Sequence, residues 1–192
     1  MIDLYTWPTP NGRKISILLE ELNAPYNVIP INISKEEQFS KKFSAISPSN
    51  KIPAIVDKEN NKNIFESGAI MLYLTTKYNN FLPEKDCGEV MQWFFYQISQ
   101  VGPILGQAHQ FLHYHAGKST FAEEKYKDYV KRVYETLDQR LLTNEYLGKE
   151  YSIADIATWP WIARFEIHKA KIEQYPNVLR WYKLITKRPA VI

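Results

Sequence analysis

The sequence predicts two domains of different class, an α/β domain over residues 1–80 and an all-α domain over residues 87–192, with a linker at 81–86. Strand and helix patterns alternate in the order βαβαββα through the first part of the chain. This order is typical of a small mixed sheet covered by helices. After the stretch YNNFLPEKD every pattern is helical, and no further strand is needed.

The strands of the first domain are predicted by short β-rich segments bounded by turn residues. These segments are IDLYT (2–6), YNVIPI (26–31), IPAIV (52–56) and NIFE (63–66). The polar run ENNKN between the last two predicts a hairpin turn.

Three helices are predicted in the same domain. GRKISILLEELN carries apolar residues at helical spacing, and GAIMLYLTTKY follows Ser67, which we expect to cap it. Between them, Phe39, Phe43 and Ile46 fall on one face of a polar stretch, which predicts a short, half-buried helix.

The second domain begins with an aromatic-rich segment at 87–116, followed by the amphipathic FAEEKYKDYVKRVYETLDQRLL, and both are expected to be core helices. Ser152 and Asp155 have the spacing of a capping box at the start of another helix. Pro176 suits the first turn of the helix that closes the chain.

Composition limits the classes of function. The chain has 192 residues, 45% of them hydrophobic, and a net charge of only +3, and it shows no basic block. We therefore expect no nucleic-acid or membrane partner. The N-terminus lacks the features of a signal peptide, so a cytoplasmic protein is expected. The single cysteine, Cys87, excludes an internal disulfide and any Cys-x-x-Cys site.

The stretch WPTPNGRKIS has the form of a strand-to-helix turn in which a thioredoxin-like redox protein would carry Cys-x-x-Cys. Here Thr9 and Gly12 occupy the two cysteine positions, with Asn11 between them. A helix N-terminus stabilises a thiolate, so the turn suits a sulfur that a ligand brings in. The alternative is that Thr9 and Asn11 only shape the turn and cap the helix.

Four motifs together resemble the glutathione transferase superfamily: TPNG after the first strand, SPSNKIPAIVD, FESGAIMLYL and YSIADIATWPW. Within it, PTPNGRKI, Gln38 and GPILGQAHQF resemble the nu class of bacterial glutathione-dependent disulfide-bond oxidoreductases. The resemblance implies a thioredoxin-like glutathione-binding domain and an all-helical glutathione-transferase domain. It also implies glutathione as bound co-substrate without a metal, and a homodimer packed through the first two helices of the helical domain, which also contributes the second-substrate site.

The resemblance also implies the site residues. Those that bind glutathione would be Thr9, Asn11, Gln38, Ile52, Pro53, Glu66, Ser67 and Arg132, and the catalytic ones Thr9 and Asn11. It implies a cis Ile52–Pro53 bond, with the Ile52 backbone pairing with the cysteinyl part of glutathione. Glu66 offers a carboxylate to an ammonium and Ser67 offers donors to a carboxylate. From the residues alone, Glu66–Ser67 could equally be a helix cap, and Arg132 a solvated helix residue.

Other candidate residues have weaker signals. His109 and His113 are four residues apart, a spacing that could chelate zinc with a third ligand, but a lining role in the second-substrate cavity is favoured. Cys87 lies in a loop-like context without the electropositive surroundings of a reactive thiol. Tyr5 is a poor candidate for thiolate activation, because the position of the tyrosine in tyrosine-type transferases falls on Trp7.

The function expected from these observations is glutathione-dependent reduction of a small disulfide, with no protein cysteine in the mechanism. Two alternatives remain open. One is a conventional transferase that conjugates glutathione to small electrophiles, and the other is a non-catalytic binding protein of the same fold.

Overall fold

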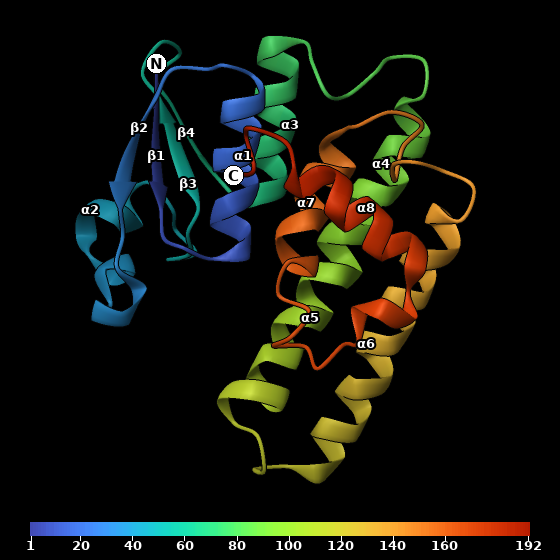
Figure 1. Cartoon of the computed structure of the whole chain (residues 1–192). Coiled ribbons are helices and arrows are strands. Elements are labelled where there is room, and N and C mark those ends of the chain that lie inside the picture. Colours follow the sequence, from blue (N-terminus) through green and yellow to red (C-terminus); the bar gives the residue numbers. More distant parts are fainter. The chain divides into compact units, whose positions relative to one another are not determined.

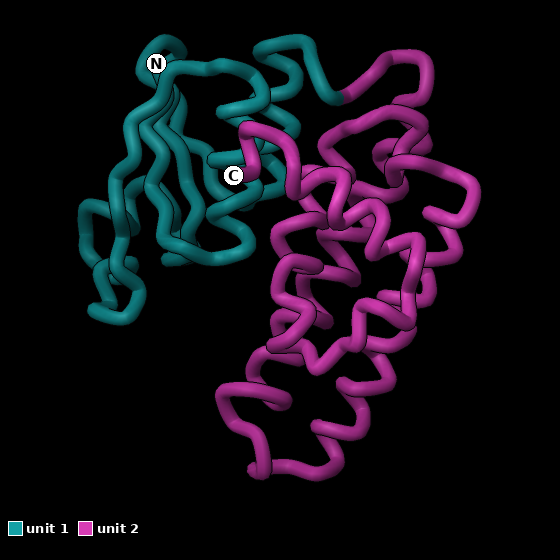
Figure 2. The backbone as a smooth tube through the Cα atoms, viewed as in Figure 1, with its two compact units in different colours: residues 1–81 teal, residues 82–192 magenta.

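The computed structural model describes residues 1–192, which form two compact units, Met1–Phe81 and Leu82–Ile192 (Figure 2). None of the helices is both long enough and apolar enough to cross a lipid bilayer.

The first unit contains a four-stranded sheet in the order β2-β1-β3-β4 and three α-helices (Figure 1). Its elements follow the predicted order βαβαββα. They are β1 (Ile2–Thr6), α1 (Pro10–Glu21), β2 (Tyr26–Pro30), α2 (Lys41–Ser44), β3 (Ala54–Asp57), β4 (Lys62–Phe65) and α3 (Ser67–Tyr78).

Both faces of this sheet are covered, α1 and α3 on one side and α2 on the other (Figure 1). β1 runs parallel to β2 and antiparallel to β3, and β3 pairs with β4 as a hairpin. On the α2 side, Tyr5, Ile31, Phe43 and Ala54 form one buried cluster. Alternate residues of β1 therefore face opposite cores.

The prediction of one continuous short helix across Phe39, Phe43 and Ile46 is wrong. The structure has two 3-10 turns followed by the single helical turn of α2. Glu36 adopts a left-handed conformation with φ 59°, which ends the first turn, and Ser40 caps a new one by accepting from the Phe43 N–H. Phe43 is consequently buried, whereas Phe39 is 62% exposed.

The junction between β1 and α1 is tight. Thr9 is the N-cap of α1, and its Oγ1 accepts a hydrogen bond from the Gly12 N–H at 3.1 Å. A β-carbon on Gly12 would lie 2.5 Å from the Trp7 carbonyl oxygen and would also meet Thr6 Oγ1. Only a glycine lets the first turn of the helix approach the end of the strand this closely.

Asp57 at the end of β3 ties α3 to the hairpin. Its buried carboxylate accepts hydrogen bonds from Lys77 Nζ and Tyr73 Oη on α3, both at 2.6 Å, and from the Glu59 N–H and Asn60 Nδ2. Burial by itself would raise the pKa of Asp57, but these donors outweigh it and lower the pKa below its usual range.

The second unit is entirely helical, as predicted. Its helices are α4 (Cys87–Tyr96), α5 (Gly102–His109), α6 (Thr120–Leu141), α7 (Ile153–Ile162) and α8 (Pro176–Thr186). Two π-helical turns, Gln97–Val101 and Gln110–Tyr114, follow α4 and α5, so the predicted segment 87–116 is one interrupted helix. Every residue of α7 is buried, because this helix packs against α4, α5 and α8.

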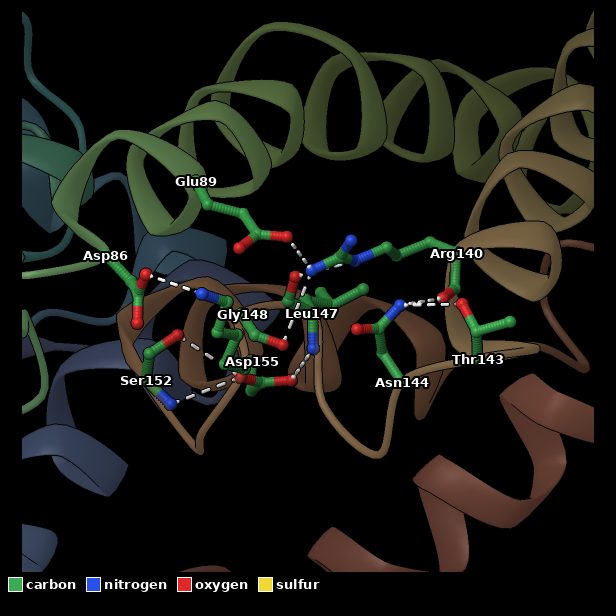
Figure 3. Close-up of polar contacts among 10 residues, drawn as sticks. Asp86, Glu89, Arg140, Thr143, Asn144, Leu147, Gly148, Ser152 and Asp155 are labelled. Atoms are coloured by element: carbon green, nitrogen blue, oxygen red, sulfur yellow. Dashed lines mark hydrogen bonds and ion pairs between the residues drawn. The ribbon is translucent and has the colours of Figure 1, made fainter.

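The capping box predicted at Ser152 and Asp155 is confirmed, and it does more than begin α7 (Figure 3). The fully buried Asp155 carboxylate accepts from the Leu147 N–H and from Trp181 Nε1, both at 2.8 Å, as well as from Ser152. Burial raises its pKa to about 6 despite these donors. This one side chain fixes the loop before α7 and the position of α8.

Arg140 of α6 completes this polar cluster (Figure 3). Its guanidinium forms an ion pair with Glu89 of α4, and its Nε donates to the Leu147 carbonyl at 3.0 Å. The group also lies 5.4 Å from the centre of the Trp93 ring. Arg140 thus joins two long helices to the loop that Asp155 holds.

We predict that Gly12→Ala lowers the free energy of unfolding by about 2 kcal/mol, because the new methyl group overlaps the backbone at the end of β1. Gly88→Ala is the matched control, since a β-carbon on Gly88 meets no atom within 4 Å. Urea unfolding of both variants measures the effect. Equal stability of the two variants would show that the junction tolerates a side chain.

Candidate functional site

The sheet register brings three of the predicted motifs to one edge of the first unit. Tyr5 of β1 pairs with Ala54 of β3, and Ala54 pairs in turn with Phe65 of β4. The turn that follows β1, the Ile52–Pro53 bond that precedes β3 and the Glu66–Ser67 pair that follows β4 therefore leave the sheet on the same side.

Thr9 has a role that the structure makes definite, since it caps α1. Accepting from the Gly12 N–H uses a lone pair of Thr9 Oγ1 and leaves its O–H able to donate. Capping and stabilisation of a bound anion are therefore compatible at this side chain. Asn11 lies within the first turn of α1 and is half-buried.

The Ile52–Pro53 peptide bond is cis, as the resemblance implied. Ile52 packs against the Tyr5 and Phe43 cluster, which holds its side chain inward. None of the backbone hydrogen bonds outside the regular helices and strands involves Ile52. Its backbone can thus pair with an extended peptide.

Ser67 is not the N-cap that the sequence predicted. It is the first residue of α3, and Glu66 occupies the cap position without a side-chain cap bond. Glu66 has a positive φ of 68°, a backbone conformation that is costly for a residue with a β-carbon. This turn leaves the Glu66 carboxylate exposed and Ser67 almost buried at the helix N-terminus.

Lys14 is a residue of this site that sequence reasoning missed. It is only 2% exposed, and its Nζ lies 3.4 Å from Ser67 Oγ. Burial lowers the pKa of Lys14 to about 7, against the opposing effect of the Glu66 carboxylate. The sequence does contain a signal for its burial, because Lys14 lies four residues before Leu18 and therefore on the apolar face of α1.

Gln38 lies in the second 3-10 turn, in the segment that leaves the sheet after β2. The Ile31 N–H donates to the Thr6 carbonyl at 2.9 Å, so this segment starts beside the end of β1. Gln38 Oε1 is sealed from solvent and has no hydrogen-bond partner. A buried acceptor without a donor is costly, so a side-chain rotation that brings Oε1 to a donor would be favourable.

Arg132, the remaining predicted binding residue, belongs to the second unit. It is exposed on α6 and lines a hollow of about 370 Å³ together with Tyr96, Gln100, Tyr129 and others. Its guanidinium lies 5.9 Å from the centre of the Tyr129 ring. The hollow offers a cation and aromatic surface to an anionic ligand.

The cavity-lining role expected of His109 is corrected by the structure. His109 is buried, and its Nε2 lies 2.8 Å from Nε2 of His168, whose Nδ1 contacts Tyr134 Oη at 3.1 Å. Burial lowers the pKa of His109 to about 4, so the pair is neutral near pH 7. The π-helical turn after α5 carries His113 to the surface instead.

Cys87 and Tyr5 also have defined places. Cys87 is the first residue of α4 rather than part of a loop, and the neighbouring Asp86 pairs with Lys149 at 2.8 Å. Tyr5 is buried against Phe43, with ring centres 6.1 Å apart. No three His, Cys, Asp or Glu side chains are placed to share a metal ion.

Two helix N-termini therefore meet at this edge, each with a hydroxyl side chain, and between them lies the backbone of Ile52. The N-terminus of α1 favours an anion of the ligand. The N-terminus of α3, beside Lys14, favours a carboxylate of the ligand, and the Glu66 carboxylate next to Ser67 favours a positive group. The arrangement suits a peptide that carries a thiolate and an amino-acid end.

Comparison with known proteins agrees with this geometry. Residues 1–76 match the family described as "Glutathione S-transferase, N-terminal domain". Residues 120–184 match "Glutathione S-transferase, C-terminal domain". These two matches cover most of both units.

Individual relatives span nearly the whole chain. The disulfide-bond oxidoreductase YfcG of Escherichia coli strain K12 is 43% identical over 99% of this chain and 92% of its own length. A glutathione transferase from Pseudomonas putida, with one glutathione disulfide bound per subunit, has a TM-score of 0.93 and 35% identity, covering 99% of this chain and 88% of that one. A glutathione transferase family member from Pseudomonas fluorescens, with two glutathione bound, has a TM-score of 0.92 and 36% identity, covering 99% and 90%. The chain described here belongs to the glutathione S-transferase family.

Proposed function

We propose that this enzyme binds glutathione in the first unit and uses its thiolate to reduce small disulfides. The observation that carries the proposal is the sulfur-free N-terminus of α1, where Thr9 caps the helix and keeps its O–H available. A free thiol has a pKa of about 8.5, and a helix N-terminus with a hydroxyl donor lowers it. The name of the similar YfcG protein supports the same reaction.

The tripeptide would lie across the edge that the sheet register creates. Thr9 and Asn11 would face its sulfur, and the Ile52 backbone before the cis Pro53 would pair with its cysteinyl residue. Glu66 would receive the ammonium of the γ-glutamyl end and Ser67 its carboxylate.

Gln38 and Arg132 would bind groups of the ligands beyond this edge of the sheet. Gln38 would accept a hydrogen bond from the ligand after its side chain turns, because Oε1 is sealed from solvent in the unliganded conformation. Arg132 would hold an anionic group of glutathione or of the second substrate at the hollow on α6.

The reaction would proceed in two exchanges. The bound thiolate attacks one sulfur of the substrate disulfide, so that one S–S bond breaks, a mixed disulfide with glutathione forms and one thiolate leaves. A second glutathione thiolate then attacks the glutathione sulfur of the mixed disulfide. This step releases the other substrate thiolate and glutathione disulfide, and each released thiolate takes up a proton. Two glutathiones are oxidised and one disulfide is reduced, while Cys87 keeps its redox state.

A conjugating transferase would use the same thiolate on a small electrophile. The glutathione disulfide bound to the similar Pseudomonas putida protein favours disulfide exchange as the main reaction. Turnover with hydroxyethyl disulfide, coupled to glutathione reductase, compared with turnover of chlorodinitrobenzene, separates the two reactions.

We predict that Thr9→Ala lowers kcat/KM for hydroxyethyl disulfide at least about tenfold, since it removes a donor to a charged sulfur. It should also lose about 1 kcal/mol of stability, because the cap is lost. Ser119→Ala is the matched control: Ser119 caps α6 in the same way, accepting from the Ala122 N–H at 3.3 Å. That variant should lose the same stability and keep full turnover. Equal losses of turnover in the two variants would assign Thr9 a purely structural role.

We also propose that the enzyme is a homodimer in the cytoplasm, packed through α4, α5 and α6. On α4, Phe95 is 51% exposed, and Trp93 of the same helix lines a hollow of about 600 Å³ with the residues of α6 around Gln139. Exposed aromatic side chains are enriched at protein–protein interfaces, and Phe95 is the one that we test.

Sedimentation velocity at micromolar concentration should therefore give twice the mass of the chain. Phe95→Glu should shift the protein toward the monomer, because it would bury a charge in the interface. Phe121→Glu is the control, since Phe121 is 74% exposed on the first turn of α6, at the opposite end of that helix from Gln139. A monomer in the unmodified protein, or equal behaviour of the two variants, would contradict this interface.

A further inference from the structure

The buried amine of Lys14 needs an explanation, because an ammonium loses most of its hydration at 2% exposure. Its neighbours on α1, Ile15 and Leu18, are fully buried apolar residues. A methionine or leucine would fill the same space at lower cost. A costly group of this kind at a cluster of candidate binding residues points to a role in the site.

The direction of the side chain shows what that role can be. Lys14 Nζ donates to Ser67 Oγ, the hydroxyl at the first position of α3. When the Ser67 oxygen accepts from Lys14, the Ser67 O–H has to donate elsewhere. Ser67 is itself 8% exposed, so a small part of it reaches solvent.

We propose that Lys14 is a positioning residue that acts through Ser67 to hold the α-carboxylate of the γ-glutamyl end, and that it takes up a proton as this carboxylate binds. The inference rests on the proposed glutathione site. Charges would then alternate in sign from the Lys14 ammonium to the ligand carboxylate, the ligand ammonium and the Glu66 carboxylate. Each charge in this row has a neighbour of opposite sign.

The charged groups around Lys14 are compatible with the uptake of a proton by its amine when the ligand binds. Glu66, before α3, is the carboxylate that acts on Lys14 in the absence of a ligand. The other charged groups of the elements packed on α1 have partners at the opposite end of the sheet: Asp3 of β1 binds Lys58, and Lys77 of α3 binds Asp57. With its pKa lowered to about 7, Lys14 is partly neutral near pH 7, and an incoming carboxylate would favour the charged form.

The test uses S-methylglutathione, which keeps the γ-glutamyl end and has no thiol to ionise. Calorimetry near pH 7.5 in two buffers of different ionisation enthalpy measures protons taken up per site. The native protein should take up a fraction of a proton, and Lys14→Met should take up none and bind about tenfold more weakly. An S-methylated analogue with γ-aminobutyrate in place of the γ-glutamyl group lacks the α-carboxylate, and it should bind both proteins equally.

The outcomes separate the two proposals. If the native protein does not bind S-methylglutathione, the proposed function fails. If it binds, and Lys14→Met keeps the same affinity and proton uptake, the role of Lys14 is overturned while the glutathione site stands. Ser67→Ala is the second variant, because it should remove the proton uptake without touching α1. Uptake that persists in Ser67→Ala would contradict action through Ser67.

Stability gives an independent readout. Unfolding returns Lys14 to its ordinary pKa near 10.5 from about 7, so between these values the unfolded state holds more protons. Stability therefore rises with pH in this window. Lys14→Met should unfold at a higher temperature than the native protein at pH 7, and the difference should shrink toward pH 10. A variant that is less stable than the native protein at pH 7 would show that the lysine is retained for packing.

Discussion

The close approach of α1 to the end of β1 is the constraint on which the site depends. Gly12 allows it, and Thr9 closes the first turn by accepting from the Gly12 N–H. The sheet register then sets the cis Ile52–Pro53 bond and the start of α3 beside this turn. Two positive helix ends and the free backbone of Ile52 thereby lie at one edge, which would let so small a sheet bind the charged tripeptide that we propose.

The two units use buried charge in different ways. In the helical unit, the Asp155 carboxylate has donors from the Leu147 N–H, Trp181 and Ser152, so it joins a loop to α8 and has no capacity left for a ligand. In the first unit, Lys14 points at the Ser67 hydroxyl, whose own hydrogen remains available to donate. Saturated buried groups specify structure, whereas a buried group that polarises a hydroxyl at the site edge is suited to binding.

Much of the fold follows from local sequence. The strands, the capping box at Ser152 and the helices of both units have strong periodic or capping signals, and they are confirmed. Three features depend on tertiary contacts and were predicted wrongly or missed. Glu36 interrupts the expected helix because its backbone is left-handed. Glu66 takes the cap position in place of Ser67. Lys14 has a charged side chain, yet it is buried because it lies on the apolar face of α1. The pairing of His109 with His168 joins residues far apart in sequence, which no local pattern indicates.

If the N-terminus of α1 ionises the sulfur of bound glutathione, as we propose, the pKa of that sulfur must fall on binding. The ultraviolet absorbance of the thiolate, followed in a pH titration of glutathione bound to the enzyme, gives the pKa of that sulfur directly. We expect a pKa at least about one unit below the value of about 8.5 for a free thiol, and a rise toward that value in Asn11→Ala. An unshifted pKa in the native complex would contradict it, whatever the rate of turnover.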